Sequence, residues 1–212
     1  MVGTVHGDNF LIVISGTPGA GKSTLTRKVV ERLGDAVGFH FDHYDREPTN
    51  SGPKDLKAWL EQGASPNAIQ RPRLVEDLRQ LCRGEAVTNP RLGTPTEPAS
   101  YVVMDGPFGR AWDPIRDLVD FVACIEVPME LALARRVLRT ADQITDSATF
   151  HADIRQGMTH YVNGGRESYV RVFARVKSAC DLVVDGTRDP DHLAEEVVGA
   201  VRAHQSRNRS RP

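Results

Sequence analysis

Short apolar runs alternate along the chain with longer segments in which apolar positions recur every three or four residues. Phe10–Ile14 is a continuous apolar run followed by glycine-rich sequence, which is typical of a strand buried on both faces of a parallel sheet. Ser23–Leu33 then predicts a helix, because its apolar positions share one stripe and Gly34 can end it. The chain therefore begins with a strand, a glycine-rich turn and a helix.

The same pattern continues to the end of the chain. Four further apolar runs predict strands over Val37–Phe41, Tyr101–Met104, Phe121–Val127 and Leu182–Val184. Helical periodicity predicts helices over Lys54–Glu61, Arg71–Cys82, Glu130–Arg139, Tyr169–Val176 and His192–Ala203, with a short helix at best over Pro114–Leu118. Thr88–Ser100 is rich in Pro, Thr and Gly and is expected to be a loop. Strands that alternate with helices predict an α/β fold, a parallel sheet with helices on both faces.

Domain organisation follows from the absence of internal repeats and long linkers in the sequence. We expect one domain over residues 1–204. The polar, mixed segment Ala141–Gly165 is expected to form a mobile lid over approximately residues 140–166. The basic tail, residues 205–212, is expected to be frayed and solvated.

Composition and charge exclude several classes of partner. Among 212 residues, 27 Lys and Arg nearly balance 28 Asp and Glu, and the net charge of -1 gives no overall attraction for nucleic acid or an anionic membrane. No apolar run is long enough for a signal peptide or a membrane span. Three widely spaced cysteines make a disulfide framework or zinc site improbable and favour a reducing, cytoplasmic setting. A polyanionic ligand would therefore need a local binding site with its own positive charge.

The turn after the first strand provides such a binding site. Its sequence from Gly16 to Thr24 fits the phosphate-binding pattern G-x-x-x-x-G-K-[ST] between a strand and a helix. Backbone N–H groups of the curled loop and the positive end of the helix would point at phosphate oxygens. Lys22 would reach the β- and γ-phosphates, and the Ser23 hydroxyl would bind Mg²⁺. The predicted nucleotide-binding residues of this loop are Gly16, Thr17, Pro18, Gly19, Ala20, Gly21, Lys22, Ser23 and Thr24.

Two acidic residues follow other predicted strands, where ligands bind in parallel sheets. Asp42 could accept a proton from a substrate hydroxyl or orient the water around a metal, although a helix cap or an exposed turn is the alternative. His43 and Tyr44 are expected to line the acceptor pocket. Asp105, at the end of an apolar strand, is placed to hold Mg²⁺ directly or through water, with a turn-forming Asp-Gly as the alternative.

Three arginines lie about one turn apart on the helix after the fourth strand along the chain. Arg135, Arg136 and Arg139 would face solvent on an ordinary surface helix. Because they precede the expected lid, we expect them to close over the γ-phosphate and neutralise charge in the transition state. Arg136 is the one assigned to catalysis, and Arg135 and Arg139 to nucleotide binding.

Together these residues resemble the uridine kinase and phosphoribulokinase-like group of P-loop small-molecule kinases, related to nicotinamide riboside kinases and pantothenate kinases. The resemblance extends from about Leu11 to Ala203. Besides the phosphate loop, its carriers are Asp42-His43-Tyr44, Ser65–Ile69, the segment from Leu74 to Pro90, Asp120, Arg135-Arg136-x-x-Arg139 and Cys180–Val184.

The resemblance implies a P-loop NTPase three-layer sandwich, with a five-stranded parallel sheet and a mobile lid, that uses ATP and Mg²⁺. Asp42 would be the base, and Lys22 and the lid arginines would stabilise the phosphates. The adenine would lie between Arg139 and the loop containing Gly186 and Thr187. The chain departs from uridine kinases at Ser65, Asn67 and Gln70, at Arg91-Leu92-Gly93, and at Asp105, where the family has glutamate. The acceptor pocket is therefore not that of a uridine kinase.

The function predicted is an ATP-dependent kinase that transfers the γ-phosphate to a hydroxyl of a nucleoside, sugar or vitamin precursor, acting as a monomer or homodimer. One alternative is a kinase of the nucleoside monophosphate, shikimate or gluconate type. An anionic acceptor would need extra arginines, and the candidates are Arg71, Arg73, Arg91, Arg110 and Arg166. Of these, Arg110 and Arg166 are predicted to bind substrate. The other alternative is a nucleotide-dependent regulatory ATPase, although no guanine-reading N-K-x-D element is present.

Overall fold

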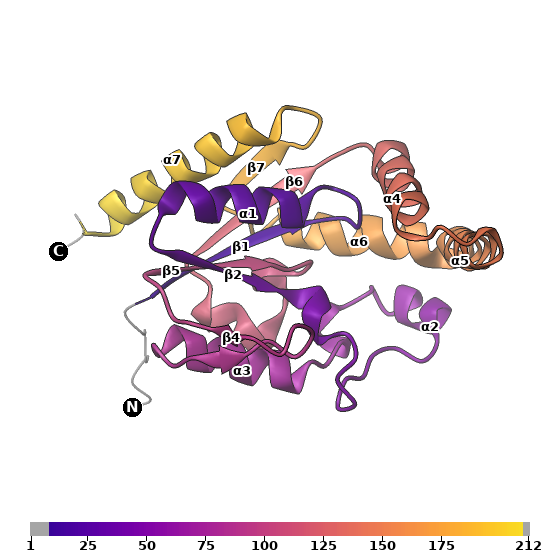
Figure 1. Ribbon diagram of the computed structural model, residues 1–212, viewed down its shortest axis with the longest axis horizontal. Coiled ribbons are helices and arrows are strands. Elements are labelled where there is room, and N and C mark those ends of the chain that lie inside the picture. Colours follow the sequence, from indigo (N-terminus) through magenta and orange to yellow (C-terminus); the bar gives the residue numbers. More distant parts are fainter. Residues whose placement is uncertain (1–8, 210–212) are drawn as a thin grey trace.

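A five-stranded sheet forms the centre of the computed structural model, which describes residues 9–209 (Figure 1). The strands are β1 Phe10–Gly16, β2 Ala36–His40, β5 Tyr101–Asp105, β6 Phe121–Glu126 and β7 Leu182–Asp185. Their order is β2-β5-β1-β6-β7, and every neighbouring pair is parallel. The five predicted strands and the parallel sheet are confirmed, and the strand that leads into the phosphate loop is the central one.

Side chains of the central strand alternate between two apolar layers. Leu11 and Val13 pack into the core shared with helices α3 Pro72–Cys82 and α6 Arg166–Lys177. Ile12 and Ile14 pack into the core shared with α1 Lys22–Leu33 and α7 Pro190–Arg209. Figure 1 shows α1 and α7 above the sheet and α3 below it. The three-layer arrangement is thus confirmed, and it follows from a strand whose side chains are apolar on both faces.

Shorter elements connect these layers. Three further helices are α2 Leu56–Glu61, α4 Met129–Gln143 and α5 Ser147–His160. The short 3₁₀ helices are η1 Phe41–Tyr44, η2 Pro66–Ala68, η3 Gly109–Ala111 and η4 Asp113–Leu118. A π turn, η5 Tyr161–Gly165, follows α5. The segment expected to be only loop contains a two-stranded ribbon, β3 Val87–Thr88 and β4 Pro95–Thr96. Its turn is closed by the Asn89 side chain, which accepts hydrogen bonds from the N–H groups of Arg91 and Leu92.

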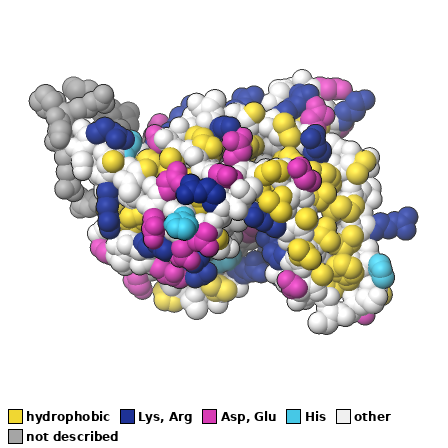
Figure 2. All heavy atoms as spheres, turned by 90° about the horizontal axis from the view of Figure 1, so that it is seen from above, with side chains coloured by type: hydrophobic (Ala, Val, Ile, Leu, Met, Phe, Trp, Pro, Cys, Tyr) yellow, Lys and Arg dark blue, Asp and Glu magenta, His cyan; other side chains and the backbone are white. Residues whose placement is uncertain are grey.

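Helices α4 and α5 extend past the edge of the sheet at the right of Figure 1. The segment expected to form a lid is therefore mostly helical, and its mobility stays a prediction. Apolar side chains gather over this end of the molecule (Figure 2), where Leu138 is 63% exposed and Val162 is 80% exposed. No helix in the described range 9–209 is both long and apolar enough to cross a membrane.

The last helix continues into the segment expected to be a frayed tail, and whether that end frays stays a prediction. Residues 205–209 belong to α7, and Gln205 accepts a hydrogen bond of 3.0 Å from the Tyr101 hydroxyl. The His204 ring also packs edge-on against Phe10 and Phe121. Residues 210–212 of the expected tail lie outside the described residues.

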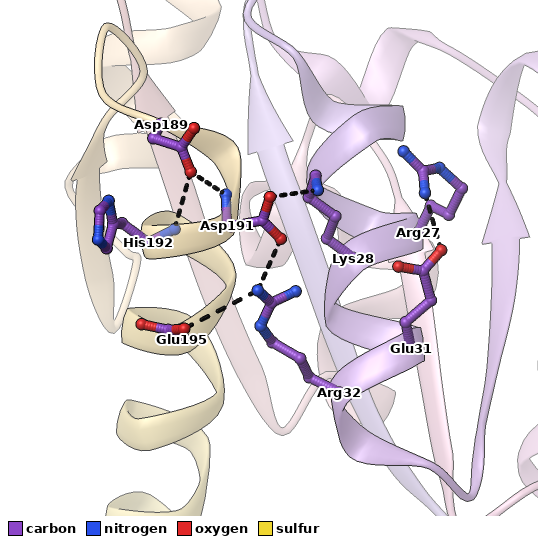
Figure 3. Close-up of polar contacts among 8 residues, drawn as sticks. All are labelled: Arg27, Lys28, Glu31, Arg32, Asp189, Asp191, His192 and Glu195. Carbon is purple, nitrogen blue, oxygen red and sulfur yellow. Dashed lines mark hydrogen bonds and ion pairs between the residues drawn. The ribbon is translucent and has the colours of Figure 1, made fainter.

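Ion pairs attach the start of α7 to α1, the helix that leaves the phosphate loop (Figure 3). The Asp191 carboxylate accepts hydrogen bonds from Lys28 Nζ at 2.7 Å and from Arg32 Nη2 at 2.6 Å. These bonds and the two positive charges lower the pKa of Asp191 to about 2. Arg32 also lies 3.9 Å from Glu195, so one basic face of α1 holds two turns of α7.

Candidate active site

The phosphate loop has the curled backbone that its sequence predicts. Gly19 and Gly21 have φ angles of +91° and +99°, in the left-handed region that other residues adopt only with strain. Gly19 also lies against α4, because a β-carbon there would come within 2.2 Å of the Ala132 carbonyl oxygen. The Ala20 N–H donates to the Thr17 carbonyl at 3.0 Å and tightens the turn. The loop therefore leads directly into the amino end of α1, where an anion is stabilised.

Lys22, the first residue of α1, carries a half-buried ammonium group next to this loop. Its Nζ lies 3.5 Å from the Thr17 carbonyl oxygen. Burial lowers the pKa of Lys22. The negative charges of Asp105 and Asp42 oppose that shift, and the positive charges of Arg139 and Arg136 add to it. The ammonium is therefore poorly solvated and lies among other cations. A bound polyanion would relieve both costs.

Asp105, at the carboxyl end of β5, is buried beside the loop. Its Oδ2 accepts a hydrogen bond from the Ser23 hydroxyl and lies 3.6 Å from His40 Nδ1. Burial would raise the pKa of Asp105, but the His40 contact and the charge of Lys22 outweigh it, so the pKa is lowered. The group is therefore an ionised carboxylate next to a hydroxyl, which are the oxygen ligands that Mg²⁺ prefers.

The donor set fits Mg²⁺ shared with a nucleotide better than a site made by protein alone. No group of three or more His, Cys, Asp or Glu side chains among residues 9–209 could hold a metal ion. A magnesium ion beside Ser23 and Asp105 would take most of its ligands from phosphate oxygens and water. The sequence reasoning missed His40, although its place at the end of the neighbouring strand, in register with Asp105, was a usable signal.

A cavity of about 580 Å³ brings most of the predicted residues together. Asp42, exposed on η1 after β2, faces this cavity with Lys22 and Asp105 because the carboxyl ends of neighbouring parallel strands meet at one edge. We call this space the phosphate cavity. Its lining residues are Pro18, Gly19, Gly21, Lys22, Ser23, Thr24, Phe41, Asp42, Asp105, Pro107, Arg135 and Arg139.

The three arginines of α4 divide between different neighbours. Arg135 and Arg139 line the phosphate cavity, and Arg135 also donates to the Gly186 carbonyl at 3.0 Å. With Gly186 and Thr187, Arg135 lines a second cavity of about 460 Å³. Arg139, which the resemblance places beside this loop, does not line that cavity, and the position of the adenine stays a prediction. The Arg136 guanidinium lies 5.6 Å from the centre of the Tyr169 ring.

Two expected substrate-binding residues have other roles in the fold. Tyr44 is 2% exposed, and its hydroxyl donates to Asp77 at 2.9 Å, so it belongs to the core and does not line the acceptor pocket. Arg110 pairs with Asp181 at 2.6 Å and donates to the Asp120 carbonyl. These acids precede β7 and β6, which places Arg110 at the amino ends of the strands, away from the phosphate loop.

His43 and Arg166 lie outside the phosphate cavity. The His43 ring is 4.8 Å from the His40 ring, and its Nδ1 lies 2.8 Å from the Asn89 side-chain nitrogen. His43 lines a cleft of about 820 Å³ between α1, β2 and the β3–β4 ribbon. Arg166 is exposed at the start of α6. The roles of both residues in substrate binding stay predictions.

Comparison with known proteins gives one family. The sequence profile of the Phosphoribulokinase / Uridine kinase family matches residues 11–192. A uridine kinase of Leuconostoc citreum is 26% identical over 148 residues, covering 63% of this chain and 69% of that protein. A uridine kinase of Vibrio campbellii is 23% identical over 191 residues, covering 82% of this chain and 85% of that protein. The solved structure of a possible uridine kinase from Bacillus stearothermophilus aligns with a TM-score of 0.48 at 17% identity, covering 84% of this chain and 89% of that one.

Proposed function

The chain belongs to the phosphoribulokinase / uridine kinase family, and from this premise we propose that it transfers the γ-phosphate of ATP to a hydroxyl of a nucleoside, sugar or vitamin precursor. Family membership makes it a small-molecule kinase, a phosphotransferase with an alcohol group as acceptor. The observation that supports the finer proposal is the phosphate cavity, where Lys22, Asp42 and Asp105 face one another.

The nucleotide would lie across the two cavities at the carboxyl ends of the strands. Backbone N–H groups of the phosphate loop would hold the phosphates, with Lys22 and Arg139 providing the positive charge. The base would lie in the second cavity, between Arg135 and the loop of Gly186 and Thr187. A near-neutral protein can bind a triphosphate in this way because the positive charge is concentrated at one loop.

Ser23 and Asp105 would hold the magnesium ion that accompanies the nucleotide. When bound, Mg²⁺ would supply positive charge that offsets the negative charge developing on the phosphates. The His40 ring and the Ser23 hydroxyl both contact Oδ2 of Asp105, which restricts the orientation of the carboxylate. These contacts keep two oxygen ligands in place next to the phosphate loop.

Asp42 would act as the proton acceptor. Within residues 9–209 no group hydrogen-bonds to its carboxylate, so both oxygens are open to the cavity. The acceptor oxygen would form a bond to the γ-phosphorus as the bond from that phosphorus to the bridging oxygen breaks, and ADP would leave with the electron pair. Asp42 would take the hydroxyl proton, while Lys22 and Arg139 neutralise charge on the transferred group.

Nucleotide binding is tested by thermal unfolding with Mg-ATP. At a ligand concentration of about 100 Kd, stabilisation of about 2.7 kcal/mol would raise Tm by about 5–10 °C for a chain of this size. Lys22→Ala is expected to abolish the shift. Lys28→Ala, six residues further along the same helix and paired with Asp191, should keep the shift. A full shift in Lys22→Ala would contradict the proposed site.

Phosphoryl transfer is tested by ADP release from Mg-ATP in the presence of a panel of nucleosides, sugars and vitamin precursors. We expect slow hydrolysis alone and turnover only with an acceptor. Rapid hydrolysis that no acceptor accelerates would overturn the kinase proposal and favour a regulatory ATPase.

A further inference from the structure

Resting on the proposed kinase activity, we propose that the acceptor is an uncharged alcohol whose apolar, ring-bearing body binds in a cavity next to the phosphate cavity. This apolar cavity has a volume of about 310 Å³. Its main walls are Leu56 and Trp59 of α2, Phe108 after β5, and Tyr169, Val172 and Phe173 of α6. The volume is at the lower end of the range for small-molecule sites.

The apolar cavity adjoins the proposed reacting centre. Gly16, Thr17 and Pro18 of the phosphate loop line it, and it shares Pro18 and Pro107 with the phosphate cavity. An occupant can therefore keep its body between the aromatic walls and extend a hydroxyl towards Asp42. The body and the reacting group of one acceptor would thus occupy adjacent spaces.

The walls offer little to a polar ligand. The Trp59 Nε1–H already donates to the Ser65 carbonyl at 2.9 Å, and the Ser168 hydroxyl donates to the Gly165 carbonyl at 2.7 Å. A polar heterocycle or sugar body would lose its hydrogen bonds to water without replacement. Two polar side chains of the lining are exceptions. One is the exposed His160 ring, and the other is Thr17, 6% exposed, whose hydroxyl has no hydrogen-bond partner within the described chain. One polar atom of the acceptor, next to the phosphate loop, would satisfy it.

Charge argues against an anionic acceptor. No Asp, Glu, Lys or Arg of the described residues lines the apolar cavity. Two of the five arginines considered for an anion are engaged nearby: Arg73 pairs with Glu47 at 2.9 Å, and Arg71 donates to the Ser51 carbonyl at 3.3 Å. Arg91 and Arg166 are exposed and do not line the apolar cavity. Arg110 lies at the other edge of the sheet, paired with Asp181. An acceptor with a carboxylate or phosphate would therefore meet no Lys or Arg in the apolar cavity, where His160 is the titratable side chain of the lining.

The two helical walls are fixed to each other. Arg171 and Arg175 of α6 donate to the carbonyls of Leu60 and Gly63, at the end of α2, at 2.8 Å and 2.9 Å. The spacing between Trp59 and the α6 side chains is therefore set before a ligand arrives. A preformed aromatic site favours a rigid ring over a flexible chain, since little conformational freedom is then lost on binding.

The test fills the cavity and compares acceptor classes. Val172→Phe places a ring in the space, and Val170→Phe, on the same helix at a position 41% exposed, is the matched control. Acceptors are 2-phenylethanol and cyclohexylmethanol as neutral ring alcohols, with uridine and shikimate as polar and anionic comparators. In the wild type, kcat/KM from ADP release should be at least tenfold higher for a ring alcohol than for either comparator. Val172→Phe should lower kcat/KM for the ring alcohol at least tenfold, and Val170→Phe should leave that kcat/KM unchanged.

A binding measurement separates this inference from the proposed function. Tryptophan fluorescence, to which Trp59 of the cavity wall contributes, is titrated with each ring alcohol without nucleotide. One outcome is a fluorescence response in the wild type that is lost in Val172→Phe, while the wild type forms no ADP with any acceptor. That outcome would support the apolar site and overturn the kinase proposal. Turnover of uridine or shikimate, with no binding or turnover of ring alcohols, would overturn this inference and keep the kinase. Leu56→Trp fills the cavity from α2 and replaces Val172→Phe if that variant does not fold.

Discussion

Replacing Asp42 by asparagine removes the proposed proton acceptor and keeps the size of the side chain. The Asp42 side chain is exposed and has no hydrogen-bond partner among residues 9–209, so the change removes no contact that holds the fold together. Substitutions at such positions usually change the free energy of unfolding by no more than about 0.5 kcal/mol. A loss of activity in Asp42→Asn would therefore report on the reaction.

The expected loss follows from the role of a general base. Such a group contributes about 10²- to 10⁴-fold to the rate, which corresponds to about 2.7–5.5 kcal/mol in the barrier. Asp42 also acts on Lys22, because its charge raises the pKa of that ammonium against the effect of burial. Removing this charge leaves Lys22 in a more cationic site, so nucleotide binding should persist. The loss should therefore fall on kcat, with the Mg-ATP thermal shift retained.

The assay measures ADP release with the best acceptor and, in parallel, the Tm shift with Mg-ATP. Asp45→Asn is the matched control, because Asp45 lies three residues away, is also exposed and does not line the phosphate cavity. It should retain wild-type turnover. Near-normal kcat in Asp42→Asn would refute the reasoning and leave Asp42 with a structural role only.

Three further variants test the loop, the metal ligands and the attachment of α7. Gly19→Ala places a β-carbon 2.2 Å from the Ala132 carbonyl oxygen at a φ of +91°. The variant should have a lower Tm and no Mg-ATP shift. A wild-type Tm together with a full Mg-ATP shift would contradict the close approach of Gly19 to α4. Ser23→Ala should raise the Mg²⁺ concentration needed for half-maximal turnover about tenfold or more. Asp191→Asn removes a carboxylate whose folded pKa is about 2, below its ordinary 3.8. A lowered folded pKa gives stability that is present above the ordinary value and lost as the pH falls through the folded one. In urea unfolding, the free energy of unfolding of the variant should thus be lower than that of the wild type at pH 7. The two free energies should converge as the pH approaches 2.

Local causes explain the parts of the structure that were predicted correctly. The Phe10–Ile14 run is apolar at every position, so it identifies a strand buried on both faces without knowledge of its neighbours. The phosphate loop is equally local, since its glycines take backbone angles that other residues avoid. Asp42 and Asp105 were found because a parallel sheet places the carboxyl ends of its strands at one edge.

The errors arise where a distant partner decides the role of a residue. Tyr44 was expected in the acceptor pocket, but its hydroxyl bonds Asp77, 33 residues away. Arg110 pairs with Asp181, 71 residues away, and Gln205 meets Tyr101 across 104 residues. Nothing in the neighbouring sequence distinguishes these side chains from solvated ones. The apolar cavity was missed for the same reason, because α2, α6 and the phosphate loop form its walls only after the chain folds.

Tyr169 connects the two cavities through one arginine. Its ring lines the apolar cavity and lies 5.6 Å below the Arg136 guanidinium. Arg136 in turn reaches the phosphate loop, where a β-carbon on Gly19 would come 3.0 Å from its Cγ. Arg135 and Arg139 line the phosphate cavity, whereas Arg136 acts at a distance, because its charge helps to lower the pKa of Lys22. If Arg136 has the catalytic role predicted for it, α6 would contribute as well as α4, and an occupant of the apolar cavity would touch the ring that contacts this charge.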